Sequence, residues 1–216
     1  QRSGRSYSPT DQSALKANGA QALIARCAKG GYIDRKCADF LVGAERQGML
    51  LGTYYYVLPG ESASSQAGRY LSRLRSIKSS RGLRTSKVLL VADFDTHCSA
   101  ELMAGFVSEI HQRTGIHPVV YLENSSTIRN SLRYASPSQK AKLKRCPYWL
   151  ALYSDKNTGL ETPLKLAHAS GIWHDWAMWQ YGGVFWQGGR SKIHNYRAGS
   201  WKTPAYFGNL DRPIER

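Results

Sequence analysis

Apolar and polar positions follow two patterns along the chain, and together these patterns predict strands that alternate with helices. Short apolar runs of strand length recur, and between them apolar residues fall at every third or fourth position. The runs predict strands at residues 21–25, 49–56, 87–94, 117–121, 147–153 and 176–181. The third run is nearly continuous in apolar residues, as expected of a parallel strand that is covered on both faces.

The stretches between these runs predict amphipathic helices. One covers residues 34–47 and ends at Gly48, and another carries an apolar stripe over residues 67–77. The clearest begins at the N-cap Ser99 and ends at Gly115, and a polar helical stretch reaches residue 144. Helices are hard to identify after residue 153, so the second half is either an irregular barrel or a differently built subdomain, and periodicity does not decide between them. We therefore expect one α/β domain over residues 1–216, an irregular, TIM-barrel-like (β/α) barrel of parallel strands with fewer helices in its C-terminal part.

Two acidic residues, Asp93 and Asp95, stand at the end of the third expected strand. Alternate side chains of a strand share a face, and the C-terminal strand ends of a parallel barrel form the mouth of its active site. Two carboxyl groups held close together do not both ionise freely, so one keeps its proton and can act as a general acid. Glycoside hydrolysis uses such a pair. The alternative is structural: one Asp caps the following helix and the other makes a hydrogen bond.

A metal site is the competing chemical interpretation of the same segment. In an extended chain Asp93, Asp95 and His97 would share one face, and Asp and His are ligands of divalent metals. His168 or His174 could complete the coordination. Because residues 96–99 are expected to turn into the next helix, we expect His97 to point away and the site to hold no metal.

Aromatic residues at the strand ends support a saccharide site, because the apolar faces of sugars stack on rings. Interior packing is the alternative for each ring. Gln180 lies between two aromatic residues, and a buried amide needs partners, so we expect it to donate to a sugar oxygen. The aromatic candidates are Tyr54, Tyr121, Trp149, Tyr153, Trp179 and Tyr181.

Five motifs in order resemble the family 25 glycoside hydrolases. The family has Gly-x-Tyr-His-Phe, Asp-x-Glu, Trp-x-Ala-x-Tyr, Trp-Gln-Tyr and a closing Val-Asp. The chain has Gly-Thr-Tyr-Tyr-Tyr at 52–56, Asp-Phe-Asp at 93–95, Trp-Leu-Ala-Leu-Tyr at 149–153, Trp-Gln-Tyr at 179–181 and Leu-Asp at 210–211. The resemblance covers about residues 12–214.

The resemblance implies a muramidase (lysozyme) that hydrolyses the β-1,4 bond between N-acetylmuramic acid and N-acetylglucosamine in peptidoglycan, without a cofactor. It implies that Asp93 orients or stabilises the N-acetyl group and the cationic centre. Asp95 takes the place of the general acid, and Asp211 joins the substrate site.

Three positions depart from the family pattern. Asp95 is one methylene shorter than the family's Glu, and a misplacement of about 1 Å can cost about a hundredfold in rate. The family's first strand carries another acid, whereas this chain has no acid before Asp11. The Thr-Glu-Gly after the family's second strand is also absent. These departures motivate an alternative, a catalytically impaired barrel that binds wall glycan or another anionic polymer.

The formal charge of +15 favours polyanionic partners. We expect peptidoglycan and anionic wall polymers, and no specific nucleic acid, because no recognised motif accompanies the charge. The tightest basic group lies in an expected helix-to-strand connection and comprises Arg73, Arg75, Lys78, Arg81, Arg84 and Lys87. No apolar run reaches the roughly 18 residues of a membrane span. We expect a monomer that is secreted, periplasmic or active at the cell wall.

The four cysteines lack the paired spacing of a zinc site. Cys27 and Cys37 are close enough in sequence to form a small loop disulfide. Cys98 and Cys146 are expected at opposite ends of the barrel, so a disulfide between them is not expected. The redox state is therefore left open.

Overall fold

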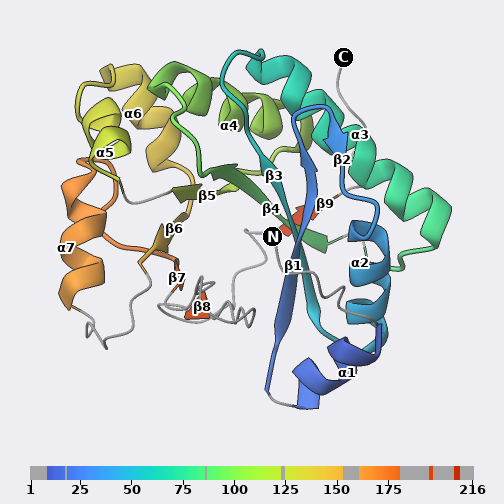
Figure 1. Ribbon diagram of the computed structural model, residues 1–216. Coiled ribbons are helices and arrows are strands. Elements are labelled where there is room, and N and C mark those ends of the chain that lie inside the picture. The colour runs from blue at the N-terminus through green and yellow to red at the C-terminus, as the bar shows by residue number, and fades with distance from the viewer. Residues whose placement is uncertain are drawn as a thin grey trace.

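The protein is a mostly parallel sheet covered by helices (Figure 1). The computed structural model describes residues 9–17, 19–85, 87–122, 125–152, 161–180, 195–196 and 207–209. In these residues β1, β3, β4, β5, β6 and β7 pair in parallel in that order. Their bounds are Ala22–Lys29, Leu50–Tyr56, Lys87–Phe94, Val119–Leu122, Tyr148–Ala151 and Met178–Gln180. This arrangement confirms the predicted α/β class.

Three short antiparallel strands complete the described sheet. β2 (Tyr32–Ile33) pairs with β1, and β8 (Asn195–Tyr196) pairs with β7. β9 (Phe207–Asn209) pairs with the first half of β4, whereas β5 pairs with its second half. β4 is thus enclosed on both edges, and its C-terminal end reaches the edge of the sheet between β3 and β5.

The helices begin and end largely where the sequence predicts. They are α1 (Pro9–Ala17), α2 (Cys37–Arg46), α3 (Ala63–Arg81), α4 (Ala100–Thr114), α5 (Ser126–Arg133), α6 (Pro137–Lys144) and α7 (Glu161–Ala169). The predicted N-cap Ser99 accepts the Leu102 N–H, and Gly115 ends α4 with a φ of 72°. The polar stretch before residue 144 is two helices, because Ser136 and Gln139 form a capping box that starts α6.

The two faces of β4 have different surroundings. Val88, Leu90 and Phe94 belong to the main core, which the helices cover, while Leu89 and Val91 belong to a second cluster. Strand alternation separates these two sets. The second cluster lies on the inner face of the curved sheet. Asp93 is the next alternate residue of β4 after Leu89 and Val91, so it lies on the same face.

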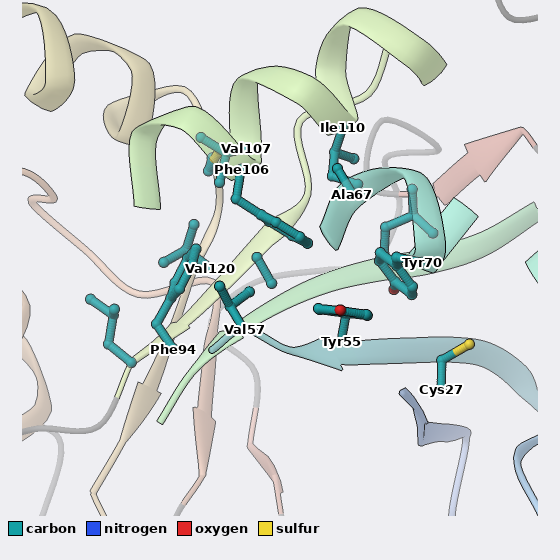
Figure 2. Packing of buried hydrophobic residues seen from close by; sticks show 14 of the residues in the cluster. Cys27, Tyr55, Val57, Ala67, Tyr70, Phe94, Phe106, Val107, Ile110 and Val120 are labelled. Carbon is teal, nitrogen blue, oxygen red and sulfur yellow. The ribbon is translucent and has the colours of Figure 1, made fainter. Parts of the chain in front are cut away.

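Aromatic rings fill the centre of the main core beneath α3 and α4 (Figure 2). Tyr55 of β3 packs against Tyr70 of α3 and Phe106 of α4, with ring centroids 5.5 and 5.7 Å apart. The Tyr70 hydroxyl donates to the Thr53 carbonyl at 2.7 Å and accepts the Val91 N–H at 3.3 Å. These contacts fix the positions of α3 and α4 relative to the middle of the sheet.

All four cysteines are buried and free. The thiols of Cys27 and Cys37 hydrogen-bond, and this bond raises the pKa of Cys37 together with burial. Cys27 and Cys37 are therefore in contact, as the sequence suggests, but as two free thiols and not as a disulfide. Within the described residues no helix has the length and apolar character that crossing a membrane requires.

Candidate active site

The two acids lie at the C-terminal end of β4 in different surroundings. Asp93 is inside the strand and only 7% exposed, whereas Asp95 follows the last strand residue and is exposed. The Asp95 backbone N–H donates to Oδ1 of Asp93 at 3.0 Å. This hydrogen bond therefore links the buried Asp93 carboxyl to the backbone of the exposed Asp95.

Burial raises the pKa of Asp93 from 3.8 to about 8. The negative charge of Asp95 adds to this rise, while the hydrogen bond from the Asp95 backbone and the cations Arg26 and Lys29 oppose it. At neutral pH the Asp93 carboxyl consequently keeps its proton. The sequence predicted that one acid of the pair would do so, and the buried position identifies Asp93.

Three of the predicted aromatic residues surround the inner face next to Asp93. Tyr54, Tyr121 and Trp149 all contact the cluster formed around Leu89 and Val91. Asp93 lies opposite Tyr121 in the parallel register, and Tyr121 lies opposite Trp149. Burial and the charge of Asp93 raise the pKa of the Tyr54 hydroxyl. The structure thus brings these rings and the acid to one face of the sheet.

Gln180 also belongs to this face. Its side-chain oxygen accepts a hydrogen bond of 2.7 Å from the Tyr121 hydroxyl, and its side chain is 8% exposed. The ring of Tyr121 meets Trp149 edge to face, with centroids 5.2 Å apart. Gln180 therefore holds the Tyr121 ring in place on this face.

Trp179 lies on the opposite face of β7. It belongs to the main core, its indole N–H donates to the Leu152 carbonyl at 2.7 Å, and its ring meets Trp176 edge to face. Because Gln180 points inward, its chain neighbour Trp179 points to the helices. The structure does not bring Trp179 to the acids.

The other sequence candidates lie outside the described residues. These are Tyr153, Tyr181 and Asp211.

A group on β1 and β3 lies beside the acids and was missed by the sequence reasoning. Lys29 lies opposite Tyr56 in the β1–β3 register and places its ammonium 4.4 Å from the ring centre. The Tyr56 hydroxyl donates to the Asp95 carbonyl at 3.3 Å, and Tyr56 lies opposite Asp93 in the register. Arg26, three residues before Lys29 on β1, pairs with Asp34 at 3.2 Å. The available signal was the presence of cations inside an otherwise apolar strand.

The metal interpretation requires an extended chain through His97, and the chain turns there. The Cys98 N–H donates to the Thr96 carbonyl at 2.6 Å, and the Thr96 hydroxyl donates to the Val57 carbonyl. Strand alternation ends before His97, whose side chain is exposed. In the part of the chain that the structure describes, no three His, Cys, Asp or Glu side chains are placed to hold a metal ion.

The basic group of the sequence lies at the opposite end of the sheet from the acids. Four of its six members are on α3, and the last of these, Arg81, forms an ion pair with Asp39 of α2. Arg84 follows α3, and its backbone N–H donates to the Glu45 carboxylate. Lys87 begins β4. Only Arg84 lies in the connection between α3 and β4. The prediction that the whole group lies in a helix-to-strand connection is therefore wrong for the four residues on α3 and for Lys87 in β4.

Comparisons with known proteins identify the family and the fold. A sequence model described as "Glycosyl hydrolases family 25" matches residues 6–187. A search of curated proteins by sequence finds no match. Among solved structures, the fold is similar to a family GH25 lysozyme from Aspergillus fumigatus, with 21% identity, a TM-score of 0.64 and 88% of each chain covered.

Two further solved structures share the fold. A muramidase from Acremonium alcalophilum has 20% identity and a TM-score of 0.62, with 88% of each chain covered. A bacterial lysozyme from Streptomyces coelicolor has 18% identity and a TM-score of 0.61, with 88% of this chain and 87% of that chain covered. The irregular barrel predicted from the strand and helix order is thereby confirmed.

Proposed function

Because the chain belongs to glycosyl hydrolases family 25, a family of peptidoglycan-hydrolysing lysozymes, we propose that Asp93 and Asp95 are the carboxyl pair with which it acts. The bond cut is the β-1,4 linkage between N-acetylmuramic acid and N-acetylglucosamine. The protein acts at the cell wall, where this substrate is found. Asp95 is the proton donor, and Asp93 positions the N-acetyl group and stabilises the cationic centre.

One observation carries this proposal, namely the proton that the pair retains at neutral pH. Asp93 is buried next to aromatic rings and has a pKa of about 8. Asp95 is exposed at the C-terminal end of β4, where a glycosidic oxygen can approach. A bound sugar covers Asp95 and removes water from it, which favours its protonated form. The charge of Asp95 raises the pKa of Asp93, so the two carboxyls interact, and we propose that the proton passes from Asp93 to Asp95 when the sugar binds.

The reaction then follows from the two positions. Asp95 donates its proton to the glycosidic oxygen as the bond from that oxygen to the anomeric carbon breaks. Asp93, now a carboxylate, stabilises the positive charge that develops on the sugar ring. Water adds to the anomeric carbon and returns a proton to the pair. Tyr54, Tyr121 and Trp149 supply apolar surface for the sugar rings, and Gln180 supplies an amide donor.

The test is digestion of purified peptidoglycan followed by mass analysis of the fragments. Asp93→Asn and Asp95→Asn should each abolish release of muropeptides, because each removes one carboxyl of the pair. The exposed Asp39→Asn on α2 is the matched control and should keep wild-type activity. If either active-site variant retains full activity, the proposed roles are wrong.

Asp95→Glu sharpens the test by lengthening the proposed donor by one methylene. The hydrogen bond from residue 95 to Asp93 comes from the backbone, so it survives this change. We expect the rate to rise, by up to about a hundredfold if the shorter Asp misplaces the carboxyl by about 1 Å. Loss of activity in Asp95→Glu would mean that this site is built around the shorter acid.

A further inference from the structure

We propose that a basic hollow on the far side of the barrel binds the phosphate groups of a phosphodiester-linked polyol or sugar polymer. The hollow has a volume of about 500 Å³. It is lined by Lys140, Ala141, Lys144, His168, Gly171, Ile172, Trp173 and His174. We refer to this set as the basic hollow.

The basic hollow lies at the end of the sheet opposite the acids. Lys144 is the last residue of α6, directly before β6, and His174 comes shortly before β7. These are the N-terminal ends of the two strands, whereas Asp93 marks the C-terminal end of β4. In Figure 1, α6 and α7 lie on the side of the molecule that carries β5, β6 and β7. A ligand there would not occupy the active site.

The lining combines positive charge with an apolar floor. Lys140 and Lys144 are one turn apart on α6, so both ammonium groups can reach one ligand. The lining residues that the structure describes include no Asp or Glu. Ile172 and Trp173 form the floor, and the ring of Trp173 is held by stacking on Tyr148 at 4.6 Å and by a hydrogen bond to the Cys146 carbonyl.

Two local contacts fix the rim of the hollow in place. The Lys140 ammonium donates to the carbonyl of Arg133, the last residue of α5, at 2.8 Å, which joins α6 to the end of α5. The His168 ring contacts the His174 carbonyl, so the end of α7 and the segment before β7 are joined. The cations are consequently presented from a folded surface.

The type of cation favours phosphate as the ligand. Planar carboxylates are best matched by the forked guanidinium of Arg, whereas Lys binds phosphate as a compact point charge. The cations lining the hollow are the two lysines, Lys140 and Lys144. The volume falls within the range of about 300 to 1,000 Å³ that is typical of small-ligand sites. It therefore accommodates one phosphate together with the adjoining polyol or sugar unit, whose carbon atoms would contact Trp173.

The choice of a wall polymer over a nucleic acid rests on the proposed function and on Trp173, the one Trp, Tyr or Phe among the described lining residues. Sequence-tolerant nucleic-acid sites stack successive bases on several aromatic side chains, while Trp173 has one ring face occupied by Tyr148. A phosphodiester polymer that is attached to peptidoglycan would hold the protein against its substrate while the opposite end of the barrel cuts.

The test measures binding of a short glycerol phosphate oligomer to the full chain by calorimetry at low salt. Inorganic phosphate and a single-stranded oligonucleotide of equal charge are compared in parallel. The double variant Lys140→Gln/Lys144→Gln should weaken oligomer binding at least about tenfold, because it removes two charged hydrogen-bond donors. Lys142→Gln is the matched control, since this exposed lysine is on the same helix but does not line the hollow.

Each outcome decides the proposal. Weaker binding in the double variant with unchanged binding in Lys142→Gln supports it, provided that circular dichroism shows the same fold. An equal effect of Lys142→Gln would show that only overall charge matters and would overturn it. Absence of oligomer binding, or tighter binding of the oligonucleotide, would also overturn it.

The measurement is independent of the proposed hydrolysis. It is repeated in the Asp95→Asn background, in which the proposed reaction is blocked and the hollow is intact. Binding without hydrolysis in the wild-type protein would reject the proposed function and leave the hollow supported. Hydrolysis without binding would do the reverse.

Discussion

The contrast between Asp93 and Asp95 comes from a difference of two positions along one strand. Asp93 is the last inward-facing residue of β4, so it is buried, while Asp95 is beyond the strand end and exposed. Burial raises the proton affinity of the Asp93 carboxyl. A carboxyl that keeps its proton at neutral pH is useful for acid catalysis, and its burial also has a measurable consequence for stability.

Stability should fall with pH because of Asp93. Its pKa is about 8 in the folded protein and about 3.8 when unfolded, so between these values the folded state holds a proton that the unfolded state has lost. Its contribution to the free energy of unfolding is complete below pH 3.8. Over the interval up to pH 8 it decreases by about 1.4 kcal/mol per pH unit.

Asp93→Asn removes this titration, so the variant should gain stability relative to wild type as pH rises from 4 to 8. Urea unfolding at pH 5, 7 and 9 measures the difference, which should grow up to pH 8 and then remain constant. Asp39→Asn, an exposed residue, should show no such trend. A difference that does not change with pH would show that the Asp93 pKa is not raised.

Sequence reasoning identified the acids and several rings because these residues follow a strand pattern that is visible in the chain. It did not identify which acid keeps the proton, since that depends on burial by distant segments. Trp179 shows the limit most clearly. It was expected at the site with Gln180, yet neighbouring residues of a strand face opposite sides, and only the structure shows that Gln180 is the inward one.

At the scale of elements, β4 has the bounds that its apolar run predicts, while β1 is longer than its run. The strand β1 extends to Lys29, beyond the expected end at residue 25, because backbone pairing with β3 continues through Arg26 and Lys29 despite their charge. A register shift between Arg26 and Ala28 accompanies this extension. Pairing partners far apart in sequence override local polarity, and that information is absent from the apolar pattern.

One buried hydroxyl of helix α3 bonds directly to two strands of the sheet, in addition to the apolar packing of this helix. The Tyr70 hydroxyl bonds to the Thr53 carbonyl and to the Val91 N–H, and Tyr70 is fully buried. Tyr70→Phe keeps the ring packing but leaves these backbone groups without this partner. We expect a loss of about 1 to 3 kcal/mol in the free energy of unfolding.

Urea denaturation measures this loss, and Tyr134→Phe is the matched control. Tyr134 is 82% exposed, so its variant should change stability by less than about 0.5 kcal/mol. Equal stability of the two variants would mean that the Tyr70 bonds contribute nothing net. Figure 2 shows Tyr70 above the sheet beside Tyr55, so a ring of the same shape should leave the packing intact.

At the scale of the whole molecule, the charge of +15 and the carboxyl pair should respond differently to salt. Attraction of an exposed cationic surface to a polyanion is screened over about 10 Å at 0.1 M salt and about 3 Å at 1 M. Asp93 is buried and close to the groups that set its pKa, so salt screens that interaction much less. Binding to the wall and cleavage of the glycan can therefore be separated.

We expect adsorption to intact walls to weaken at least about tenfold between 0.05 and 0.5 M NaCl, because bound counterions are released when cations meet a polyanion. The rate constant on a short soluble glycan, at saturating concentration, should change by less than about twofold over the same range. Sedimentation of walls with bound protein measures the first quantity, and chromatography of the products measures the second. Walls stripped of phosphate polymers are the control and should show a smaller salt effect. If both quantities fell in parallel, the positive surface would have to act in the chemical step, and the assignment of charge to wall attraction would be wrong.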